Sequence, residues 1–423
     1  MATELKVYKY RLYPTIAQES LLNQYVGAKR WFYNYLLSEQ KRRFANKEKL
    51  LSGFDCNNLL PKLKKEETTA WLKTVDSILL QNAAEDLSIA YKNFFDSVTG
   101  RRKCPTVGVP KYKRKGGRES YRTRGVKVDF NNNIVVLPKI KSVKCILHRE
   151  FNGTIKSSTI SKNPDGKWYI SILVETDQQL KPMTGKEVGI DLGLKDLAIL
   201  STGVKFDHPQ QMLARAKQAL KRAQRILARK TKGSKNYEKQ RLVVAKCYSK
   251  ITRMRNEYYH ILSKYLVETF DAIYLENLNV SGMLKNRSLS RKISESAWST
   301  LKAMIKYKAG YAGKTVYEIS RWFPSSKTCS SCGHKLDKLD LGTREWTCPS
   351  CGTHHDRDIN AAKNILNQGQ KDLYDGIIPS RATMEEELKI PMALMKHSSK
   401  IERSVSRRYG LNGDKASLTV FSC

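Results

Sequence analysis

Four cysteines in the last third of the chain constrain its fold more than any other feature. They form two Cys-x-x-Cys pairs with fifteen residues between the pairs, at Cys329, Cys332, Cys348 and Cys351. Four thiolates carried on two tight turns can close a tetrahedral shell around zinc. Gly333 and Gly352 follow the second cysteine of each pair, where glycine tolerates such a turn. A closed shell leaves no open coordination position, so we expect one structural Zn²⁺ holding a ribbon over residues 325–355.

Other residues near this motif leave the zinc prediction unchanged. Three histidines could act as substitute ligands, but the cysteines already fill the shell; they are His334, His354 and His355. The remaining cysteines are scattered singly, as is typical of reduced thiols inside a cell; they are Cys56, Cys104, Cys145, Cys247 and Cys423.

The charge balance predicts a polyanionic partner. Lys and Arg number 77 against 40 Asp and Glu, a formal net charge of +37. A compact chain with this surplus repels itself unless a polyanion neutralises it, and nucleic acid is the expected one. Solvated lysines or a membrane surface are the alternatives. No apolar run is long enough to span a membrane, and the N-terminus lacks the apolar block of a signal peptide. We therefore expect an intracellular protein without a membrane partner.

Periodicity divides the chain before the cysteines. Residues 4–13 alternate like a half-exposed strand, and 16–96 have helical spacing. Short strands with turns between them then predict a small barrel that the first strand would complete; they span 126–130, 133–137, 142–147, 154–160 and 167–175. Later come an apolar strand over 187–200 and a helical hairpin over 211–264. A strand at 272–276, a helix at 295–312 and a strand at 315–319 follow.

Several basic or polar segments are candidates for nucleic-acid contact. From Thr99 to Lys127 there are eleven basic residues and one acid, and aromatic rings lie between the cations. Such a stretch suits backbone contact and base stacking, although a solvated loop is the alternative. The candidates are Lys111, Tyr112, Lys113, Arg114 and Tyr121 in this stretch, Arg222 and Arg225 in the hairpin, and Lys327 beside the first cysteine.

Three carboxylates predict a second metal centre. Asp191 interrupts an apolar strand, Glu276 ends another, and Asp358 lies at a helix start just after Asp356. A buried acid is costly unless it is paired or binds a cation. Taken singly, Asp358 could be a helix N-cap and Glu276 a strand-end ion pair. Together the three acids fit a site for two Mg²⁺ or Mn²⁺ ions about 3.5–4 Å apart. With a phosphodiester substrate implied by the charge, this predicts a nuclease.

Longer stretches resemble one known family. The pieces are YKYRLYPT at 8–15, QNAAEDLSIAYKNFF at 81–95, GIDLGL at 189–194, LENL at 275–278, RWFPSSKTCSSCG at 321–333 and DRDINAAKNI at 356–365. Together they resemble the TnpB family, transposon-encoded RNA-guided endonucleases related to type V CRISPR effectors. The resemblance covers nearly the whole chain up to about residue 370.

The resemblance implies a multidomain fold of α+β and α/β parts. A wedge-type β-barrel over 1–15 and 99–183 would be interrupted by a helical recognition domain over 16–98. An RNase H-like (RuvC) nuclease domain over 184–370 would follow, with the zinc ribbon inserted at 325–355. The tail, 371–423, is expected to be disordered.

The resemblance also assigns roles to residues. Asp191, Glu276 and Asp358 would be the catalytic acids that bind Mg²⁺, with Asp356 in support. Some family relatives have lost these acids and act as RNA-guided repressors. All three are present here, so cleavage is expected.

The partners implied are a noncoding guide RNA from the transposon end and double-stranded target DNA beside a short flanking motif. Base pairing would read the target while the protein grips the backbone. Ser77, Gln81 and Asn82 would read the flanking motif, since Gln and Asn can pair with adenine; ordinary polar helix positions are the alternative. The protein is expected to be monomeric with its RNA, in a prokaryotic-type cytoplasm near the nucleoid. The rival hypotheses are a repressor without cleavage and a RuvC-like nuclease, such as a junction resolvase, without guide RNA.

Overall fold

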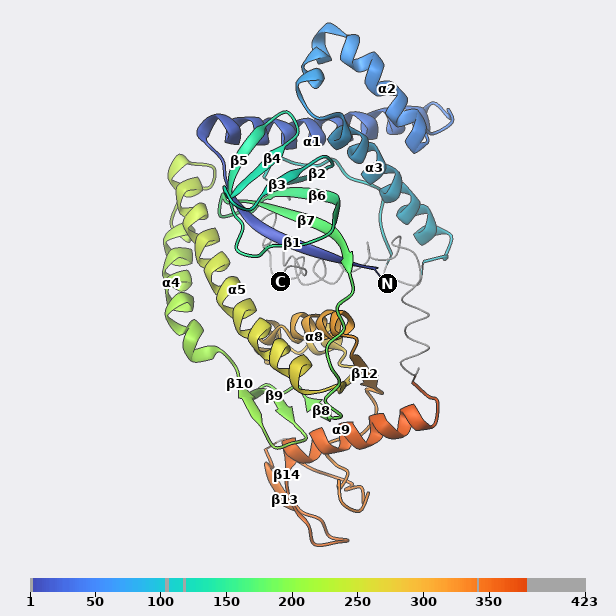
Figure 1. The fold of residues 1–423 in the computed structure, drawn as a ribbon, viewed down its shortest axis with the longest axis vertical. Coiled ribbons are helices and arrows are strands. Elements are labelled where there is room, and N and C mark those ends of the chain that lie inside the picture. The colour runs from blue at the N-terminus through green and yellow to red at the C-terminus, as the bar shows by residue number, and fades with distance from the viewer. Residues whose placement is uncertain (1–2, 103–105, 117–118, 341, 379–423) are drawn as a thin grey trace. The chain divides into compact units, whose positions relative to one another are not determined.

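The computed structural model describes residues 3–102, 106–116, 119–340 and 342–378, and its elements are shown in Figure 1. Within these ranges the contacts divide the chain into two units. Unit 1 comprises residues 3–177 and 230–246, and unit 2 comprises 178–229 and 247–378. Most of the predicted tail therefore lies outside the described residues.

Unit 1 contains a seven-stranded antiparallel sheet in the order β2-β6-β7-β1-β5-β4-β3. The strands are β1 (Thr3–Tyr13), β2 (Glu119–Thr123), β3 (Lys127–Asp129), β4 (Ile134–Leu137), β5 (Lys141–Ile146), β6 (Thr154–Lys162) and β7 (Trp168–Asp177). The first strand of the chain lies in the middle, because β1 pairs with β7 along its length and with β5 at its end. In the described part, β2 and β3 remain unpaired edges, so the sheet is a half-barrel rather than the closed barrel predicted.

Helices of unit 1 share one hydrophobic core with this sheet. They are α1 (Ile16–Ala45), α2 (Gly53–Lys65), the 3₁₀ helix η1 (Glu67–Thr74) and α3 (Ser77–Val98). The α1 helix begins after Pro14 because Thr15 and Gln18 form a capping box. Apolar side chains of α1 and α3, such as Phe32 and Leu80, join Trp168 and Ile170 of β7 in the core. On α3 the buried apolar side chains lie in the first half of the helix and include Leu80, Ala83 and Leu87.

Strand β2 was not predicted, because its residues lie inside the basic stretch. Arg122 lies there between Tyr121 and Thr123, which face the core, and Tyr121 is only 2% exposed. Its ring lies 5.6 Å from that of Tyr25 on α1, and burial raises the pKa of its hydroxyl well above the usual value. The expectation that Tyr121 stacks on a base is therefore wrong for this conformation, because the ring is part of the core.

Unit 2 contains a five-stranded mixed sheet in the order β10-β9-β8-β11-β12. The strands are β8 (Glu187–Asp191), β9 (Asp196–Leu200), β10 (Lys205–Asp207), β11 (Ala272–Glu276) and β12 (Thr315–Ile319). The strands β8, β11 and β12 are parallel, whereas β9 and β10 are antiparallel to their neighbours.

The single strand predicted over 187–200 is thus an antiparallel pair, β8 and β9. The chain reverses between them at Gly193, where a side chain would meet the carbonyl oxygen of Asp196. This close backbone approach requires glycine, and the apolar pattern of the segment hid it.

The helices of unit 2 cover both faces of its sheet. They are α4 (Gln210–Ala228), α5 (Lys235–Thr269, with 235–246 in unit 1), α6 (Val280–Met283), α7 (Ser290–Ser296), α8 (Trp298–Ala312) and α9 (Arg357–Tyr374). Alternate residues of β11 separate the two faces: Ile273 packs in a core with α5 and α8, whereas Tyr274 packs in a second core with Ile365 of α9. Figure 1 shows α9 lying across this sheet.

Two predicted boundaries differ from the structure. The helix expected over 295–312 is broken at Ala297, whose φ of 41° lies in the left-handed region, so α7 and α8 are separate. The α9 helix continues to Tyr374, beyond the expected domain end at 370. In the described ranges, no helix has both the length and the apolar composition needed to cross a bilayer.

Candidate functional site

Strand register brings two of the predicted acids to one sheet edge. Asp191 is the last residue of β8 and Glu276 is the last residue of β11, its parallel neighbour. Ile190 is paired with Leu275, so the next residue of each strand comes to the same carboxyl-terminal end of the sheet. Carboxyl ends of parallel strands are where ligand sites form in open α/β sheets.

The third acid comes from a helix that packs closely on the same strand. Asp358 is in the first turn of α9. A side chain on Gly189 of β8 would collide with the carbonyl oxygen of Ala362 and the amide nitrogen of Leu366. Only glycine permits this approach of helix to strand, and Ala362 is fully buried in it. Gly189 and Ala362 together allow this close packing of helix on strand.

Asp356, rather than Asp358, caps the helix. Its Oδ1 accepts hydrogen bonds from the backbone N–H groups of Asp358 and Ile359, each at 3.0 Å. Its Oδ2 accepts from Lys205 Nζ of β10 at 2.6 Å. Burial alone would raise the pKa of Asp356, but these donors outweigh it and hold the pKa below its usual value. The alternative that Asp358 is the N-cap is therefore wrong, and its carboxylate is left for another role.

Burial and neighbouring carboxylates affect the protonation of Asp191. Burial raises the pKa of Asp191 to about 7, and the negative charges of Glu276 and Asp358 add to the rise. Burial also raises the pKa of Glu276, although a hydrogen bond from Ser325 Oγ to its Oε1, 2.5 Å long, partly offsets the effect. Among the described residues, the side-chain partner of Glu276 is the hydroxyl of Ser325 and not a cation, so the ion-pair alternative does not describe this strand end.

These acids fit a divalent cation by chemistry. Carboxylate oxygens are hard ligands that suit Mg²⁺ or Mn²⁺. The negative charges that raise the pKa of Asp191 would be relieved by a bound cation. Among the described residues, the four thiol sulfurs lie within 4.8 Å of one another, but the oxygens of the three acids do not. Closure of the carboxylates around an ion would therefore require side-chain movements.

The four cysteines are placed for zinc. Their sulfur atoms all lie within 4.8 Å of one another. The separations are 3.7 Å from Cys329 to Cys351 and 3.6 Å from Cys332 to Cys348. A tetrahedral site with Zn–S bonds of about 2.3 Å has sulfur–sulfur edges of about 3.8 Å, so the thiols match a closed shell.

Around the thiols, a short hairpin completes the ribbon. It consists of β13 (Glu345–Thr347) and β14 (His354–Asp356). His355 Nε2 lies 3.0 Å from Cys329 Sγ, and its ring packs on Trp346. This places His355 beside a ligand sulfur rather than in place of one.

Two asparagines of α9 join the acidic helix to the first cysteine turn. Asn360 donates to the Thr328 carbonyl at 2.7 Å and accepts from the Ser330 amide at 2.9 Å. Asn364 donates to the carbonyl oxygens of Ser325 and Thr328. Both asparagines are buried. The segment that carries Ser325 and Cys329 is thus fixed to the helix that carries Asp358.

Sequence reasoning missed three polar residues at the acids. Ser325 bonds Glu276, Lys205 bonds Asp356, and Arg344 Nη1 of the ribbon lies 3.5 Å from Asp358 Oδ2. The side chain of Arg344 is half exposed. Ser325 lies within the segment 321–333 that resembles the TnpB family. Single Ser, Lys and Arg residues, however, give no periodic or spacing signal.

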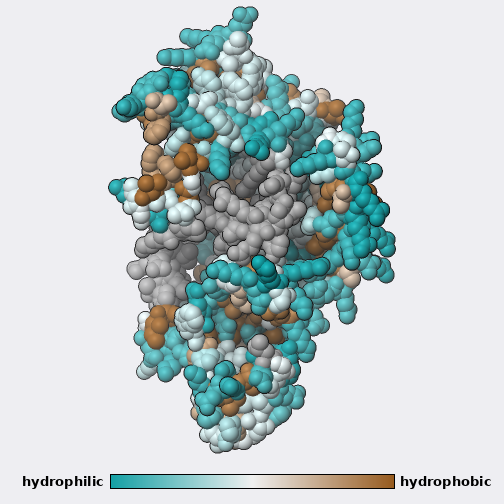
Figure 2. All heavy atoms as spheres, turned by 180° about the vertical axis from the view of Figure 1, so that it is seen from behind, coloured by the Kyte–Doolittle hydropathy of each residue, from teal (hydrophilic) through white to brown (hydrophobic). Residues whose placement is uncertain are grey.

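The nucleic-acid candidates of unit 2 are in two settings. Arg222 and Arg225 are exposed on α4. Lys327 is partly buried, and its Nζ donates to the Asp337 carbonyl at 2.8 Å within the ribbon. In the view of Figure 2, hydrophilic residues cover most of the described surface, and apolar residues lie in small separate groups.

In unit 1, the basic stretch keeps several exposed candidates. Lys111, Tyr112 and Arg114 are exposed, and Lys41 Nζ lies 4.4 Å above the Tyr112 ring. Lys113 is more constrained: its Nζ is 3.8 Å from the centre of the Tyr33 ring and 3.6 Å from Asp86.

The polar candidates on α3 differ in availability. Asn82 is buried, and its amide donates to the carbonyl oxygens of Ile78 and Arg122. The expectation that Asn82 reads a base is wrong for this conformation, because its donors are already used. Ser77 accepts a hydrogen bond from Lys64, and Gln81 is exposed.

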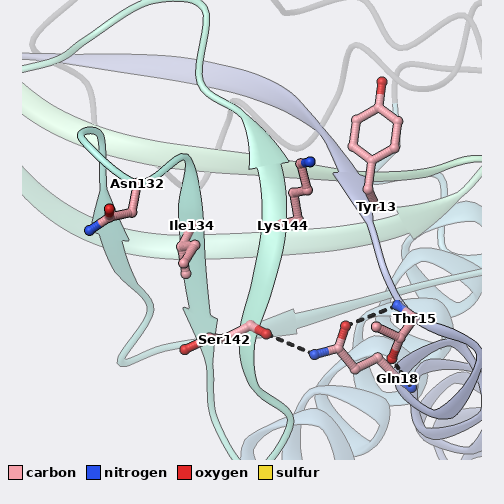
Figure 3. Close-up of a pocket in the computed structure, with 7 residues that line it drawn as sticks. All are labelled: Tyr13, Thr15, Gln18, Asn132, Ile134, Ser142 and Lys144. Atoms are coloured by element: carbon pink, nitrogen blue, oxygen red, sulfur yellow. Dashed lines mark hydrogen bonds between the residues drawn. The ribbon is translucent and has the colours of Figure 1, made fainter.

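A pocket of about 420 Å³ lies in unit 1, away from every predicted site residue. Figure 3 shows its lining from the end of β1, the start of α1 and the β4–β5 region, with Gln18 donating to the Ser142 carbonyl. Gln18 also accepts from the Thr15 amide. The pocket contains no carboxylate or thiol, so it is not the candidate catalytic site.

Comparison with known proteins identifies the family. A protein of Streptomyces pristinaespiralis named "Putative RNA-guided DNA endonuclease" is 36% identical over 380 residues, which cover 89% of this chain and 92% of that protein. The chain belongs to the TnpB family. A second relative, from Escherichia coli K12 and named "Putative RNA-guided DNA endonuclease InsQ", is 30% identical and covers 86% of this chain and 92% of its own length.

Family models match three parts of this TnpB-family chain. The OrfB_IS605 model, described as "Probable transposase", matches residues 170–287, and the "Cas12f1-like, TNB domain" model matches 298–365. A "Helix-turn-helix domain" model matches 1–49, where the structure has β1 followed by the single helix α1. A cryo-EM structure of a Cas12f1–sgRNA–target DNA complex covers 86% of this chain at 14% identity, with a TM-score of 0.47, a likeness too weak to assign a function.

Proposed function

We propose that this protein is an RNA-guided DNA endonuclease that cleaves double-stranded DNA beside a short flanking motif by two-metal phosphodiester hydrolysis. The observation that carries the proposal is the meeting of Asp191, Glu276 and Asp358 from two adjacent parallel strands and one closely packed helix. Membership of the TnpB family and the printed names of the two relatives support the same activity.

The sheet of unit 2 supports an RNase H-like (RuvC) domain. Three antiparallel strands in sequence, β8 to β10, are extended by the parallel strands β11 and β12. We assign this domain to 184–370 with the ribbon at 325–355 inserted. The half-barrel (1–15 and 99–183) and the helices of 16–98 would form the wedge and recognition parts. In the same proposal, 371–423 contributes no chemistry.

Asp191, Glu276 and Asp358 would hold two Mg²⁺ ions. When bound, these ions supply a nucleophilic water and charge stabilisation at the scissile phosphate. The protein's own groups prepare the site: Ser325 fixes the Glu276 carboxylate, and Asp356 fixes the first turn of α9. Arg344, half exposed beside Asp358, can contact a phosphate oxygen, because a guanidinium donates in a planar fork.

The positive charge supports a guide RNA and DNA as partners. Exposed cations on α4 and in the basic stretch would neutralise phosphates without reading sequence. Base pairing with an RNA from the transposon end would supply target choice, and exposed Gln81 remains a candidate for the flanking motif. We place the complex in a prokaryotic-type cytoplasm as one chain with one RNA.

A single preparation tests this proposal. The full chain is purified with its RNA, the RNA is sequenced, and a duplex matched to that RNA is offered with Mg²⁺. We expect cutting that requires the matching RNA and is lost in Asp191→Ala while DNA binding persists. RNA-independent cutting would favour the junction-resolvase alternative. Matched binding without cutting by the parent chain would favour the repressor alternative.

A further inference from the structure

Trp322 is a solvent-exposed aromatic side chain in the loop that leads from β12 to Ser325. It is 85% exposed. The next residue, Phe323, packs against the core formed by Tyr274, Tyr317 and Ile365. One aromatic ring of the pair therefore anchors the loop, while the other projects from it. A tryptophan ring left in solvent forgoes the stabilisation that burial would give, and it stays available to a binding partner.

The loop that carries Trp322 is fixed at several points. The Trp322 amide donates to Ser320 Oγ at 3.3 Å, and the Phe323 amide donates to the Ser320 carbonyl at 3.2 Å. The Pro324 carbonyl accepts from the Lys327 amide and from Thr328 Oγ1, both at 3.0 Å. A ring on a fixed loop loses little conformational freedom when it binds a flat partner.

The same loop reaches the carboxylate site. It follows β12, whose last residue, Ile319, accepts a hydrogen bond from the amide of Asn277, the residue after Glu276. Ser325, three residues after Trp322, bonds the Glu276 carboxylate. Three residues span at most about 11 Å even when extended. The Trp322 backbone therefore lies within about 11 Å of the backbone of Ser325, the residue that contacts Glu276.

We infer that Trp322 stacks on an unpaired base of the DNA strand being cut, next to the scissile phosphate. This rests on the proposed nuclease function. Base–aromatic stacking is independent of sequence and suits an enzyme whose target choice comes from base pairing. Exposed Arg321, directly before Trp322, adds a cation for the neighbouring phosphate. The stacked base would fix the strand so that its phosphate lies at the three acids.

An abasic-site scan tests this inference. The full chain with its copurified RNA is given matched duplexes in which one abasic nucleotide is moved stepwise past the cut position. The parent is expected to lose roughly ten- to a hundredfold in cleavage rate at one position. Trp322→Ala should lose as much on the intact duplex and nothing further at that position. Trp322→Phe should keep most of the parent rate.

A second readout does not depend on cutting. With 2-aminopurine at the sensitive position, Asp191→Ala should quench its fluorescence on binding, and Asp191→Ala combined with Trp322→Ala should not. Tyr374→Ala is the matched control, since Tyr374 is 92% exposed at the far end of α9, about 24 Å along the helix from Asp358; it should behave as the parent.

The outcomes separate this inference from the function beneath it. Parent-like cutting by Trp322→Ala, or an unchanged abasic profile in that variant, rejects stacking while leaving the nuclease intact. Full cutting by Asp191→Ala, or no cutting by the parent, rejects the proposed function and the stacking with it. If Trp322 instead binds a protein partner, the abasic profile of Trp322→Ala will match that of the parent.

Discussion

The hydroxyl of Ser325 donates to the carboxylate of Glu276, with 2.5 Å between Oγ and Oε1. This bond opposes the rise that burial causes in the pKa of Glu276. Ser325→Ala should raise that pKa further, so a larger share of Glu276 is protonated near neutral pH. We expect the acid limb of the cleavage pH profile to move upward and the Mg²⁺ requirement to increase. Ser326→Ala, one residue along, is the control; equal profiles for both variants would remove the role given to Ser325.

Asp191 predicts an unusual dependence of metal-free stability on pH. Its pKa is about 7 in the folded chain, against about 3.9 for a free side chain. The folded state therefore holds a proton that the unfolded chain releases, and stability falls as pH rises from about 4 through about 7. Asp191→Asn buries no negative charge, so it should melt a few degrees above the parent at pH 8 without added Mg²⁺. The gap should close near pH 4; a gap that does not change with pH would contradict the prediction.

Asp356 is expected to matter through helix geometry. Asp356→Ala removes the cap of α9 and the partner of Lys205, and losing such a cap costs about 1–2 kcal/mol. Asp356→Asn keeps an oxygen acceptor for the cap and loses only the charge. Thermal unfolding and cleavage should rank the parent first, Asn next and Ala last. If Asn and Ala are equally impaired, the ion pair with Lys205 rather than the cap is what the site requires.

Gly189 should not tolerate a methyl group. In Gly189→Ala the new carbon meets backbone atoms of Ala362 and Leu366, which cannot rotate away as a side chain would. Overpacking of this kind costs about 1–3 kcal/mol, and it displaces the helix that carries Asp358. We expect a lower unfolding midpoint and weaker cutting. Gly310→Ala in α8, where nothing lies near the added carbon, should be neutral or slightly stabilising.

The zinc content of the purified chain tests whether the four thiols of the ribbon bind a metal ion. Elemental analysis of the purified chain should give about one zinc per chain, and Cys332→Ser should give much less because three thiolates no longer close the shell. Limited proteolysis should then cut the variant within 325–355. Cys247→Ser, at a half-buried thiol outside the ribbon, should retain zinc. Zinc at parent level in Cys332→Ser would contradict the four-thiol assignment.

The features that could be predicted from the sequence were those with a local pattern of residues. Cysteine spacing is a local chemical pattern, and the structure gathers all four sulfurs as that spacing predicts. Asp191 and Glu276 stood out because acids interrupt apolar strands, and strand register brings them to one edge. Their roles in catalysis remain predictions.

Elsewhere, tertiary context decided against local pattern. Tyr121 resembled a stacking residue among cations, but alternation in β2 turns it into the core. The reversal at Gly193 was hidden in an apolar run, and Asp356 and Asp358 could not be ranked as caps before the helix start was known. Ser325 gave no signal, because a serine becomes important only through the partner that folding brings to it.

The asparagine bonds from α9 to the first cysteine turn affect how metal requirements are measured. Asn360 and Asn364 connect the thiol shell to the helix of Asp358, and the segment just before that turn carries Ser325, which bonds Glu276. A chelator strong enough to strip zinc would thus disarrange the carboxylates as well. Adding back magnesium alone would then leave the protein inactive, and the loss could be mistaken for irreversible denaturation or for direct zinc catalysis. Order of metal addition, with zinc before magnesium, becomes the informative variable.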